Sequence, residues 1–239
     1  MYNELAKVSD TAVCLTSEME SYCEKSGDTY EVIFSDDGST DGCASAIPTS
    51  EVLSLRHGNI VIVRSNVNRG KGAAVRLAVS ESSGEIVMYT DCDLAYGTKV
   101  ILEAFEIMKH STTHMLAGSR ALHKDGYGEY SLLRRIASKV YLKLLSFITG
   151  ISVTDSQCGF KLFQGDFARK IFPMCETDGW AFDLELFLLA KGENATVSEM
   201  PVAIVKHDDS HINVITDSVK MLREVFRIKK RAKLRQKNK

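Results

Sequence analysis

Short apolar runs alternate along this chain with segments in which apolar residues recur at every third or fourth position. Runs rich in β-branched and aromatic residues predict strands, and the longer spacing predicts helices with one apolar face. In the first half, the predicted strands are residues 30–34, 59–63, 85–90 and 113–119. The predicted helices there are residues 5–22, 72–82 and 99–109. This alternation predicts an α/β fold whose sheet carries helices on its faces.

Beyond about residue 130 the order of elements becomes less regular. The same two patterns predict a helix at 132–149, a strand at 159–163, a helix at 182–191, a strand at 197–205 and a final helix from about Ile215. No proline-rich or glycine-rich linker interrupts the chain, and no segment repeats internally. We therefore predict a single domain over residues 1–219, followed by a basic helix or tail at 220–239.

The composition is that of one globular domain. Of the 239 residues, 44% are hydrophobic and 26% are charged, which excludes a disordered chain, a collagen and a small disulfide scaffold. The longest stretch without a charged residue is residues 144–154, far short of the roughly 20 apolar residues of a spanning helix. The N-terminus has no apolar run typical of a signal peptide.

The six cysteines never form a C-x-x-C pair, so we expect free thiols in the cytoplasm and no zinc site.

The near-neutral overall charge hides an uneven distribution. The chain carries 30 Lys and Arg against 31 Asp and Glu, yet residues 220–239 hold ten of the basic residues and one acid. The body is therefore acidic, and the C-terminal segment is strongly cationic. Segments of this kind bind phosphates, nucleic acid or an anionic membrane surface.

Two acidic strand ends are the first candidates for chemistry. Asp36 and Asp37 follow the strand at 30–34, at the sheet edge where ligands of open α/β folds bind. Another predicted strand ends in D-C-D, and alternate residues of an extended chain point the same way, so Asp91 and Asp93 can face one cation. Mg²⁺ takes one or two carboxylates together with substrate phosphate oxygens. For Asp36 and Asp37 the alternative is an ordinary turn, which Asp and Gly favour.

A glycine-rich basic turn lies between these two strand ends in the sequence. In residues 66–74, Arg69 and Lys71 sit among glycines that let the backbone approach a ligand, and the next helix offers its N-terminus. This combination suits a diphosphate, although the spacing is neither that of a P-loop nor that of a dinucleotide-binding turn. A glycine turn with solvated charges is the structural alternative.

Several motifs occur in a fixed order along nearly the whole chain. They are YNE (2–4), SDDGSTDG (35–42), NRGKGAAVR (68–76), DCDLA (91–95), AGSR (117–120), DSQCGFKLF (155–163) and WAFDLELF (180–187). Together they resemble inverting glycosyltransferase family 2, and within it the branch that uses polyprenyl phosphates. The last two motifs are the most specific, because they distinguish this branch from members that extend polysaccharides.

The resemblance implies a GT-A fold, a Rossmann-like mixed sheet flanked by helices. It implies that a sugar is transferred from a nucleotide donor with inversion, using Mg²⁺ or Mn²⁺. It divides the domain into a nucleotide-binding half of about 1–120 and an acceptor half of about 121–219. Asp91 would contact the donor and, with Asp93, the metal.

The resemblance also assigns residues to the nucleotide. Tyr2, Glu4 and Asp37 would hold the base and the ribose, and Asp36 would support the turn. The glycine-rich segment would bring two basic side chains near the nucleotide, those of Arg69 and Lys71.

On the acceptor side, the resemblance places cations and polar groups. Arg120, in the AGSR motif, would meet an anionic acceptor, and Arg134 is a further cation for it. Asp155, Gln157 and Lys161 would line the same side.

The acceptor decides whether a catalytic base is required. A hydroxyl must lose its proton in the transition state, so an enzyme that uses one needs a carboxylate within reach, here Asp155, Asp183 or Glu185. A phosphate monoester has a second pKa of about 6 and is already a nucleophile at neutral pH. With such an acceptor, Arg120 and Arg134 matter more than a base. The alternative for Asp183 and Glu185 is a helix start, where acidic residues favour the helix dipole.

Two further features favour a lipid acceptor. The helix predicted at 132–149 has an apolar face beside a stripe of basic residues at every fourth position, a pattern typical of a helix in a membrane interface. Core packing with solvated lysines would give the same pattern. The basic tail adds attraction to an anionic leaflet, so we expect a peripheral protein at the cytoplasmic face of a membrane. Nucleic acid is disfavoured, because no base-stacking motif accompanies the lysines.

The chain departs from the family at its start. Relatives begin with a hydrophobic strand and a proline before Y-N-E, and here the chain opens at Met1. That strand would lie in the interior of the sheet, so we expect a gap beside the nucleotide site and a truncated start. A degenerate, inactive copy is the other explanation.

The leading hypothesis is therefore a metal-dependent transferase that moves a hexose, with glucose from UDP-glucose preferred, onto a polyprenyl phosphate of the dolichyl type. The alternatives are transfer to a glycan or other hydroxyl, and an inactive peripheral membrane or nucleotide-binding homologue.

Overall fold

The structure is a computed structural model that describes residues 1–126, 132–205 and 214–237, without the side chains of 132–139, 141, 214–222, 233, 236 and 237. Its strands are β1 (Tyr30–Asp36), β2 (Gly58–Arg64), β3 (Ile86–Thr90), β4 (Met115–Ser119), β5 (Phe160–Gln164) and β6 (Val197–Pro201). Its helices are α1 (Leu5–Ser26), α2 (Lys71–Glu81), α3 (Lys99–Lys109), α4 (Leu132–Thr149), α5 (Gly165–Ile171), α6 (Phe182–Gly192) and α7 (Val214–Lys237). Two 3₁₀ turns, η1 (Cys43–Ala46) and η2 (Phe172–Met174), complete the described elements.

Every strand and helix predicted from the sequence is present. Helices α3 and α4 have the predicted bounds, whereas α1 runs four residues beyond its predicted end at residue 22. Strand β6 is shorter than predicted, because it ends at Pro201, which has no N–H to donate to a ladder. Helix α5 and the two 3₁₀ turns were not predicted, since they are too short to show a periodic pattern.

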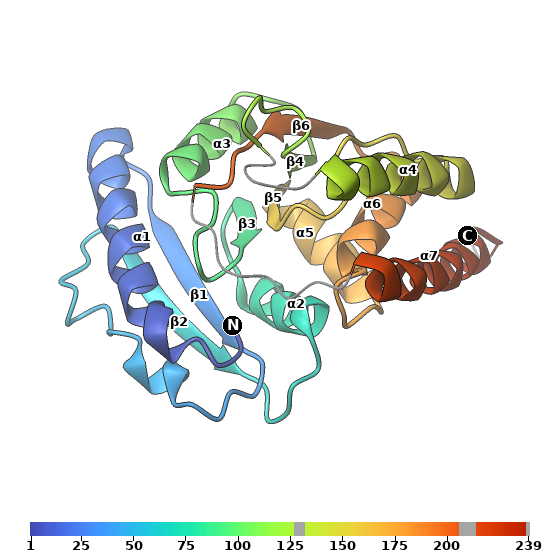
Figure 1. Ribbon diagram of the computed structural model, residues 1–239. Helices are drawn as coiled ribbons and strands as arrows, with labels where there is room; N and C mark the ends of the chain where they lie inside the picture. Colours follow the sequence, from blue (N-terminus) through green and yellow to red (C-terminus); the bar gives the residue numbers. More distant parts are fainter. Residues whose placement is uncertain (127–131, 206–213, 238–239) are drawn as a thin grey trace.

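The strands form two sheets, as Figure 1 shows. In the smaller sheet, β1 and β2 are parallel; in the larger one, the order is β3, β5, β4, β6. Strand β5 is antiparallel to β3 and to β4, and β6 is parallel to β4. The α/β fold with helices on a mixed arrangement of strands is thereby confirmed.

A gap in the sheet was predicted beside the nucleotide site, and no ladder joins β1 to β3 in the part of the chain that the structure describes. The edge of β1 that does not pair with β2 carries Met1 instead. The ammonium group of Met1 donates to the Ser35 carbonyl at 2.7 Å, and the Asp37 N–H donates to the Met1 carbonyl at 3.0 Å. Met1 therefore lies along the carboxyl end of β1.

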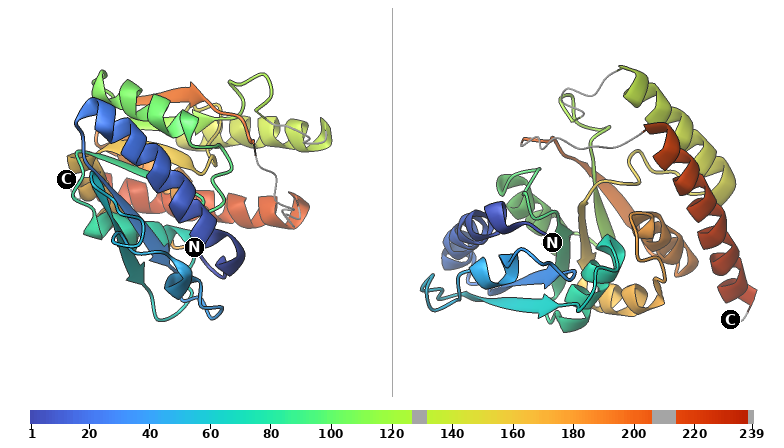
Figure 2. Two further views of the ribbon diagram at one scale, coloured as in Figure 1. Left: turned by 90° about the vertical axis from the view of Figure 1, so that its left-hand side faces the viewer. Right: turned by 60° about the horizontal axis from the view of Figure 1, so that its bottom comes forward.

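Helices cover both faces of the larger sheet (Figure 2). Because side chains alternate along a strand, Met115 and Ala117 of β4 face one layer and Leu116 faces the other. The first layer contains α2, α5, α6 and parts of α4 and α7, and the second contains α3. Helix α1 packs on the smaller sheet through Val8 and Ala12. The core therefore fixes the sheet edge from which the candidate site is built.

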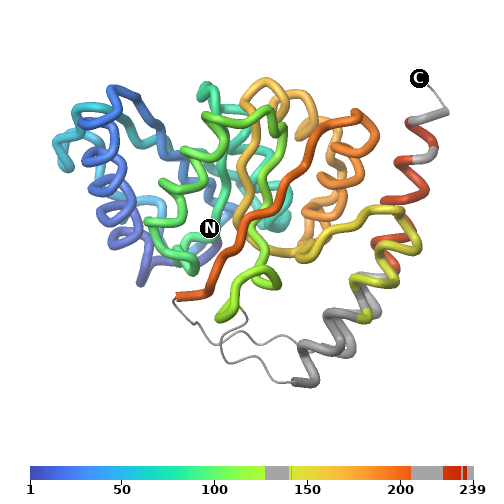
Figure 3. The backbone as a smooth tube through the Cα atoms, turned by 90° about the horizontal axis from the view of Figure 1, so that it is seen from above, coloured from blue at the N-terminus to red at the C-terminus, as the bar shows by residue number. Residues whose placement is uncertain are grey.

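Helices α4 and α7 lie side by side at the end of the molecule remote from β1 and β2 (Figure 3). Helix α7 also packs on α6, with Val225 and Ile228 buried, and it passes residue 220 without a break. Residues 220–237, the described part of the segment predicted as a basic helix or tail, thus continue a docked helix. None of the helices in the described residues is both long and apolar enough to cross a membrane.

Candidate functional site

Strand direction brings the predicted motifs together. Because β5 is antiparallel to β3, the residues just before β5 lie beside the residues just after β3. The approach is close: a Cβ on Gly159 would lie 2.2 Å from Asp91 Oδ2, so no larger residue fits there. The DCD and SQCG motifs, 60-odd residues apart in sequence, therefore share one edge of the sheet.

Asp36 and Asp37 are buried at the end of β1. The carboxylate of Asp37 accepts the N–H of Arg69 at 2.9 Å and the N–H of Gly70 at 2.7 Å. Asp36 accepts the N–H of Ser39 at 2.9 Å and forms an ion pair with Arg64 at 3.2 Å. Both carboxylates thus hold turns in place, and Asp37, which the resemblance assigned to the base and ribose, anchors the glycine-rich turn.

Tyr2 and Glu4 lie at the start of the chain, next to the turn that follows β1. The side chain of Tyr2 is exposed, and the Glu4 carbonyl accepts the N–H groups of Lys7 and Val8 at the start of α1. The neighbouring Asn3 N–H donates to the Ser39 hydroxyl at 2.9 Å. The structure therefore places the YNE motif against the SDDGSTDG motif.

Asp91 and Asp93 follow β3 on a tight turn. Asp91 forms an ion pair with Lys71, the first residue of α2, and Asp93 accepts the N–H of Ala95 at 3.0 Å. The next residue, Leu94, is buried with φ of 49°, a strained backbone for a side chain of that size. Strain of this kind persists only where the surrounding structure enforces it.

Lys71 connects the glycine-rich turn to the acidic strand end. Burial favours the neutral amine, but the negative charges of Asp91 and Asp183 outweigh it, so the pKa of Lys71 lies above its ordinary value. Its ammonium also lies 5.0 Å from the ring centroid of Trp180. Lys71 is therefore a fixed cation beside a half-exposed carboxylate.

The loop of residues 175–180 was missed by the sequence reasoning. The carbonyl of Asp178 accepts the N–H of Gly72 at 2.7 Å, and its carboxylate pairs with Arg76 and with Arg69. Gly70, with φ of 111°, has no room for a Cβ, which would lie 2.7 Å from the Asp178 carbonyl oxygen. The position of Asp178 just before the WAFDLE motif was the available signal.

Arg120 and Asp155 form a bidentate ion pair. Arg120 Nε donates to Asp155 Oδ2 at 2.6 Å and Nη2 donates to Oδ1 at 3.0 Å. Burial alone would raise the pKa of Asp155, but the hydrogen bonds and charge of Arg120 outweigh it, and the pKa lies below its ordinary value. Glu199 of β6, which no motif indicated, accepts the N–H groups of Thr154 and Asp155. The turn that carries Asp155 is thus held from β6.

Lys161 and Asp183 are buried beneath the site. Lys161 Nζ donates to Asp183 Oδ1 at 2.5 Å and to the Cys158 carbonyl at 2.6 Å, and the Tyr89 hydroxyl donates to the same carboxylate. Tyr89 and Lys161 are direct partners in the β3 and β5 register. Burial raises the pKa of Tyr89 well above its ordinary value. Lys161, assigned to the acceptor side by the resemblance, has a fully buried side chain that holds the SQCG turn.

The remaining candidates are placed as follows. Gln157 is half-buried, and its N–H donates to Asp155 Oδ1 at 3.2 Å. Glu185 is buried in the first turn of α6, where the sequence pattern also predicted a helix start. Arg134 lies in α4 with its side chain outside the described residues.

The donor set fits a hard divalent cation bound together with a diphosphate. Within residues 1–126, 132–205 and 214–237, no three His, Cys, Asp or Glu side chains gather as a complete protein cage. Asp91 and Asp93 offer carboxylate oxygens from one turn, and Mg²⁺ takes one or two carboxylates while substrate phosphates supply other ligands. The carboxylates of Asp91 and Asp93 thus fit a divalent cation whose other ligands come from a bound diphosphate.

Solved structures with the same arrangement of elements define the class of the fold as GT-A. Mannosyl-3-phosphoglycerate synthase from Rubrobacter xylanophilus matches 97% of this chain and 72% of its own, with a TM-score of 0.62 and 17% identity. Glucosyl-3-phosphoglycerate synthase from Mycobacterium tuberculosis, in complex with phosphoglyceric acid, matches 95% of this chain and 77% of its own, with a TM-score of 0.64 and 14% identity. At these identities the likeness concerns the fold alone.

The profile of glycosyl transferase family 2 matches residues 1–172, and the chain belongs to that family. Dolichyl-phosphate beta-glucosyltransferase of Dictyostelium discoideum is 32% identical over 84% of this chain, which spans 62% of that protein. The protein of the same name from Saccharomyces cerevisiae is 30% identical over 95% of this chain, which spans 72% of it. The resemblance inferred from the motifs is confirmed.

Proposed function

We propose that the protein is an inverting hexosyltransferase that moves glucose from a nucleotide donor such as UDP-glucose onto a polyprenyl phosphate of the dolichyl type. Two relatives at 30% identity or more carry the name dolichyl-phosphate beta-glucosyltransferase, which supports the sugar and the acceptor. A more distant neighbour of the same fold was solved with Mn²⁺, UDP-glucose and phosphoglyceric acid, which supports the donor class.

The burial of the candidate bases is the main observation that favours a phosphate acceptor over a hydroxyl acceptor. Asp155, Asp183 and Glu185 are each at most 5% exposed, and each is engaged by a cation. A base for a hydroxyl acceptor has to reach the proton that it abstracts and needs a pKa near the working pH. Asp155 has a lowered pKa instead. A phosphate acceptor, largely dianionic at neutral pH, needs no base.

In the proposed reaction, an oxygen of the acceptor phosphate attacks C1 of the sugar as the bond from C1 to the donor diphosphate breaks. The electron pair of that bond leaves with the diphosphate, and the configuration at C1 inverts. Arg69 and Lys71 bind the diphosphate. Asp91 and Asp93 would hold Mg²⁺ or Mn²⁺, which when bound offsets the negative charge on the leaving group.

Arg120 is proposed to orient the acceptor phosphate. Its guanidinium is planar and permanently charged, and Asp155 fixes the plane through two parallel hydrogen bonds. Asp155 is then a positioning residue and not a base. Arg134 and Gln157 remain proposed acceptor contacts, and Lys161 and Asp183 support the SQCG turn from below.

The test is transfer from labelled UDP-glucose to dolichyl phosphate or undecaprenyl phosphate with Mn²⁺. We expect a labelled lipid whose formation stops when the metal is chelated. Absence of labelled lipid, in the presence of measurable donor binding, would refute the proposed activity.

A hydroxyl acceptor is the second candidate, and Asp155 distinguishes the two. If Asp155 were the base, Asp155→Asn would abolish transfer at every pH while leaving donor binding intact. If it orients Arg120, the amide still accepts a hydrogen bond, and we expect residual transfer with a raised KM for the lipid acceptor.

We also propose peripheral attachment to the cytoplasmic face of a membrane. Phe147 on α4 is 88% exposed, and Phe226 on α7 is also exposed. Exposed basic side chains accompany them on both helices, namely Lys143, Arg223, Arg227 and Lys230. Apolar and cationic groups together suit an anionic bilayer surface. Sedimentation with vesicles that contain phosphatidylserine should fall as salt is added, and salt-independent or absent binding would contradict the proposal.

A further inference from the structure

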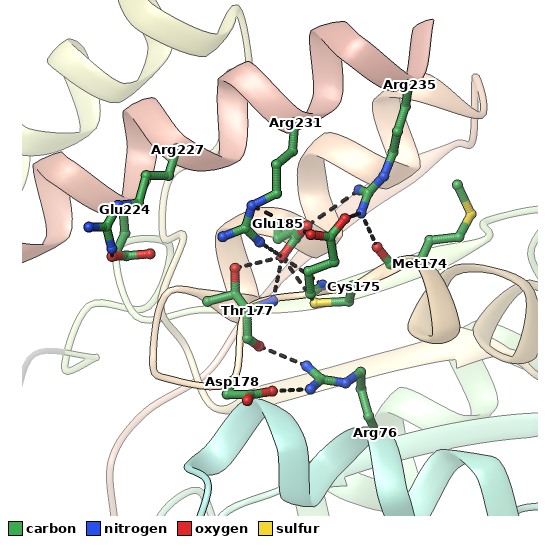
Figure 4. Close-up of polar contacts among 11 residues, drawn as sticks. Arg76, Met174, Cys175, Thr177, Asp178, Glu185, Glu224, Arg227, Arg231 and Arg235 are labelled. Atoms are coloured by element: carbon green, nitrogen blue, oxygen red, sulfur yellow. Dashed lines mark hydrogen bonds and ion pairs between the residues drawn. The ribbon is translucent and has the colours of Figure 1, made fainter. Parts of the chain in front are cut away.

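Two arginines of the cationic C-terminal segment point into the molecule. Figure 4 shows Arg231 and Arg235 of α7 reaching Glu185. Both arginines also form ion pairs with Glu176. Arg235 Nη1 lies 3.3 Å from Glu185 Oε1, and Arg231 Nη1 lies 3.7 Å from Glu185 Oε2. Arg227, one turn earlier, pairs with Glu224 of its own helix instead. Arg231 and Arg235 thus differ from Arg227, because they form ion pairs with a residue of α6 and not with their own helix.

Glu185, which pairs with these two arginines, also binds the loop of residues 175–180. Its side chain is 1% exposed, and Oε2 accepts the N–H of Thr177 at 2.8 Å and the Thr177 hydroxyl at 2.6 Å. Arg235 also donates to the carbonyl of Met174, the residue just before this loop. A buried carboxylate is costly unless cations and hydrogen bonds satisfy it, so Glu185 needs both α7 and the loop.

The loop in turn holds the glycine-rich turn. The Thr177 carbonyl accepts from Arg76 at 2.8 Å, and the Asp178 carbonyl accepts the N–H groups of Gly72 and Ala73 at 2.7 and 3.3 Å. A Cβ on Gly72 would lie 2.4 Å from the Thr177 carbonyl oxygen, so the two backbones are in direct contact. The next residue of α2 toward the site is Lys71, the cation beside Asp91.

We infer that Arg231 and Arg235 are positioning residues for donor binding. Through Glu185 and the 175–180 loop, α7 holds the turn that presents Arg69 and Lys71 to the diphosphate. Without the two guanidinium groups, Glu185 loses its cations, the loop loses its anchor, and the turn becomes less well ordered. The inference rests on the proposed function for the identity of the donor, but the contact between loop and turn can be measured without any transfer.

The experiment compares the Arg231→Met and Arg235→Met double variant with Arg227→Met. Hydrogen exchange is followed at the Gly72 and Ala73 amides and, for reference, in β2. We expect exchange at residues 72 and 73 to accelerate roughly tenfold in the double variant while β2 is unchanged. The KM for the nucleotide-sugar should rise roughly fivefold to tenfold with kcat changed less than threefold. Arg227→Met removes one charge from the same helix without touching Glu185, and it should leave exchange at residues 72 and 73 and the KM for the nucleotide-sugar as in the wild type.

Fluorescence gives an independent reading, because Trp180 is the single tryptophan of the chain and is 68% exposed in this loop. Titration with UDP should change its emission in the wild type, and the apparent dissociation constant should rise in the double variant. Equal exchange at residues 72 and 73 in both proteins, or equal acceleration in β2, would overturn the inference. Failure of glucosyl transfer with an intact exchange difference would count against the proposed function alone.

A milder variant covers the case in which the double variant does not fold. Thr177→Val removes one hydrogen bond to Glu185 and keeps the volume and all arginines. We expect the same changes at about a third of the size. Arg235→Lys keeps the charge but cannot donate from two guanidinium nitrogens to Glu185 and Met174 at once. Its exchange rates and KM should therefore lie between those of the wild type and those of Arg235→Met. A KM unchanged in Thr177→Val together with unchanged exchange would also refute the inference.

Discussion

Two ion pairs flank the candidate site, and their carboxylates differ in exposure to solvent. In the pair of Lys71 and Asp91, the carboxylate side chain is 36% exposed, whereas in the pair of Arg120 and Asp155 it is 7% exposed. The first pair has one cation on one carboxylate oxygen, and the second is bidentate with a further backbone hydrogen bond from Arg120. Under the proposed function, the first pair would exchange partners with a diphosphate and a metal, while the second pair would stay fixed.

Under the proposed function, this difference would let one sheet edge serve two substrates. A donor that carries its own metal requires carboxylates which can change partners, so a half-exposed pair at a strained turn is suitable. An acceptor that brings only a phosphate requires a cation already in position. The lowered pKa of Asp155 keeps that carboxylate charged, and Arg120 in turn keeps its orientation.

The largest expected effect comes from breaking the fixed pair. Arg120→Met leaves Asp155 buried without its cation, so the free energy of unfolding should fall by about 3 to 5 kcal/mol and transfer should be lost. Urea denaturation measures the first and the lipid transfer assay the second. The Arg120→Met and Asp155→Leu double variant should recover most of the stability and none of the transfer. A stable, active Arg120→Met protein would show that the pair is not fixed.

Asp91→Asn should have the next largest effect, on activity and not on stability. Because the pair is half-exposed, the free energy of unfolding should change by less than about 1 kcal/mol. Transfer should fall roughly 100-fold or more, since the amide holds a divalent cation poorly. Initial rates over a Mn²⁺ titration provide the measurement. Full activity at saturating Mn²⁺ would exclude Asp91 from the donor site.

Lys71→Met should have a smaller effect, confined to the donor. We expect the KM for the nucleotide-sugar to rise roughly tenfold, because one charged hydrogen bond to the diphosphate is lost. The KM for the lipid acceptor should stay within twofold. A matched rise in both constants would mean that Lys71 acts on the whole site and not on the donor alone.

The smallest effect concerns pH. The pKa of Asp155 is lower in the folded protein than in the unfolded chain, so its pairing contributes stability at neutral pH that is lost as pH falls through the folded value. The difference in unfolding free energy between wild type and Asp155→Asn should be constant between pH 5 and 7 and shrink below about pH 4. Denaturant unfolding at a series of pH values tests this, and a difference that changes between pH 5 and 7 would contradict it.

The sequence predicted the elements well because their patterns are long. Eleven-residue or longer helices such as α3 show several turns of the apolar period, whereas α5, with seven residues, shows fewer than two. The order of strands in the larger sheet did not follow from the pattern, since periodicity carries no information about which strands pair.

The motifs predicted which residues lie together at the candidate site, but they did not predict the partners of those residues. Asp37 is satisfied by two backbone N–H groups, which no residue type indicates. Lys161 offered a clearer signal, because a lysine within the buried residues F-K-L-F of β5 requires a buried carboxylate, and Asp183 is that partner. Nothing in the sequence distinguishes Arg231 and Arg235 from the other basic residues of 220–239, because their pairing with Glu185 depends on how α7 packs on α6.

The central position of β5 has a consequence for synthesis. Strands β3 and β4 each pair with β5 and not with one another, although both precede it by 40 residues or more. During translation, a nascent chain that has emerged as far as β4 therefore lacks the strand that joins the two. The larger sheet can close only after the DSQCGFKLF motif has left the ribosome, so folding of the candidate site is a late event that depends on contacts between distant segments.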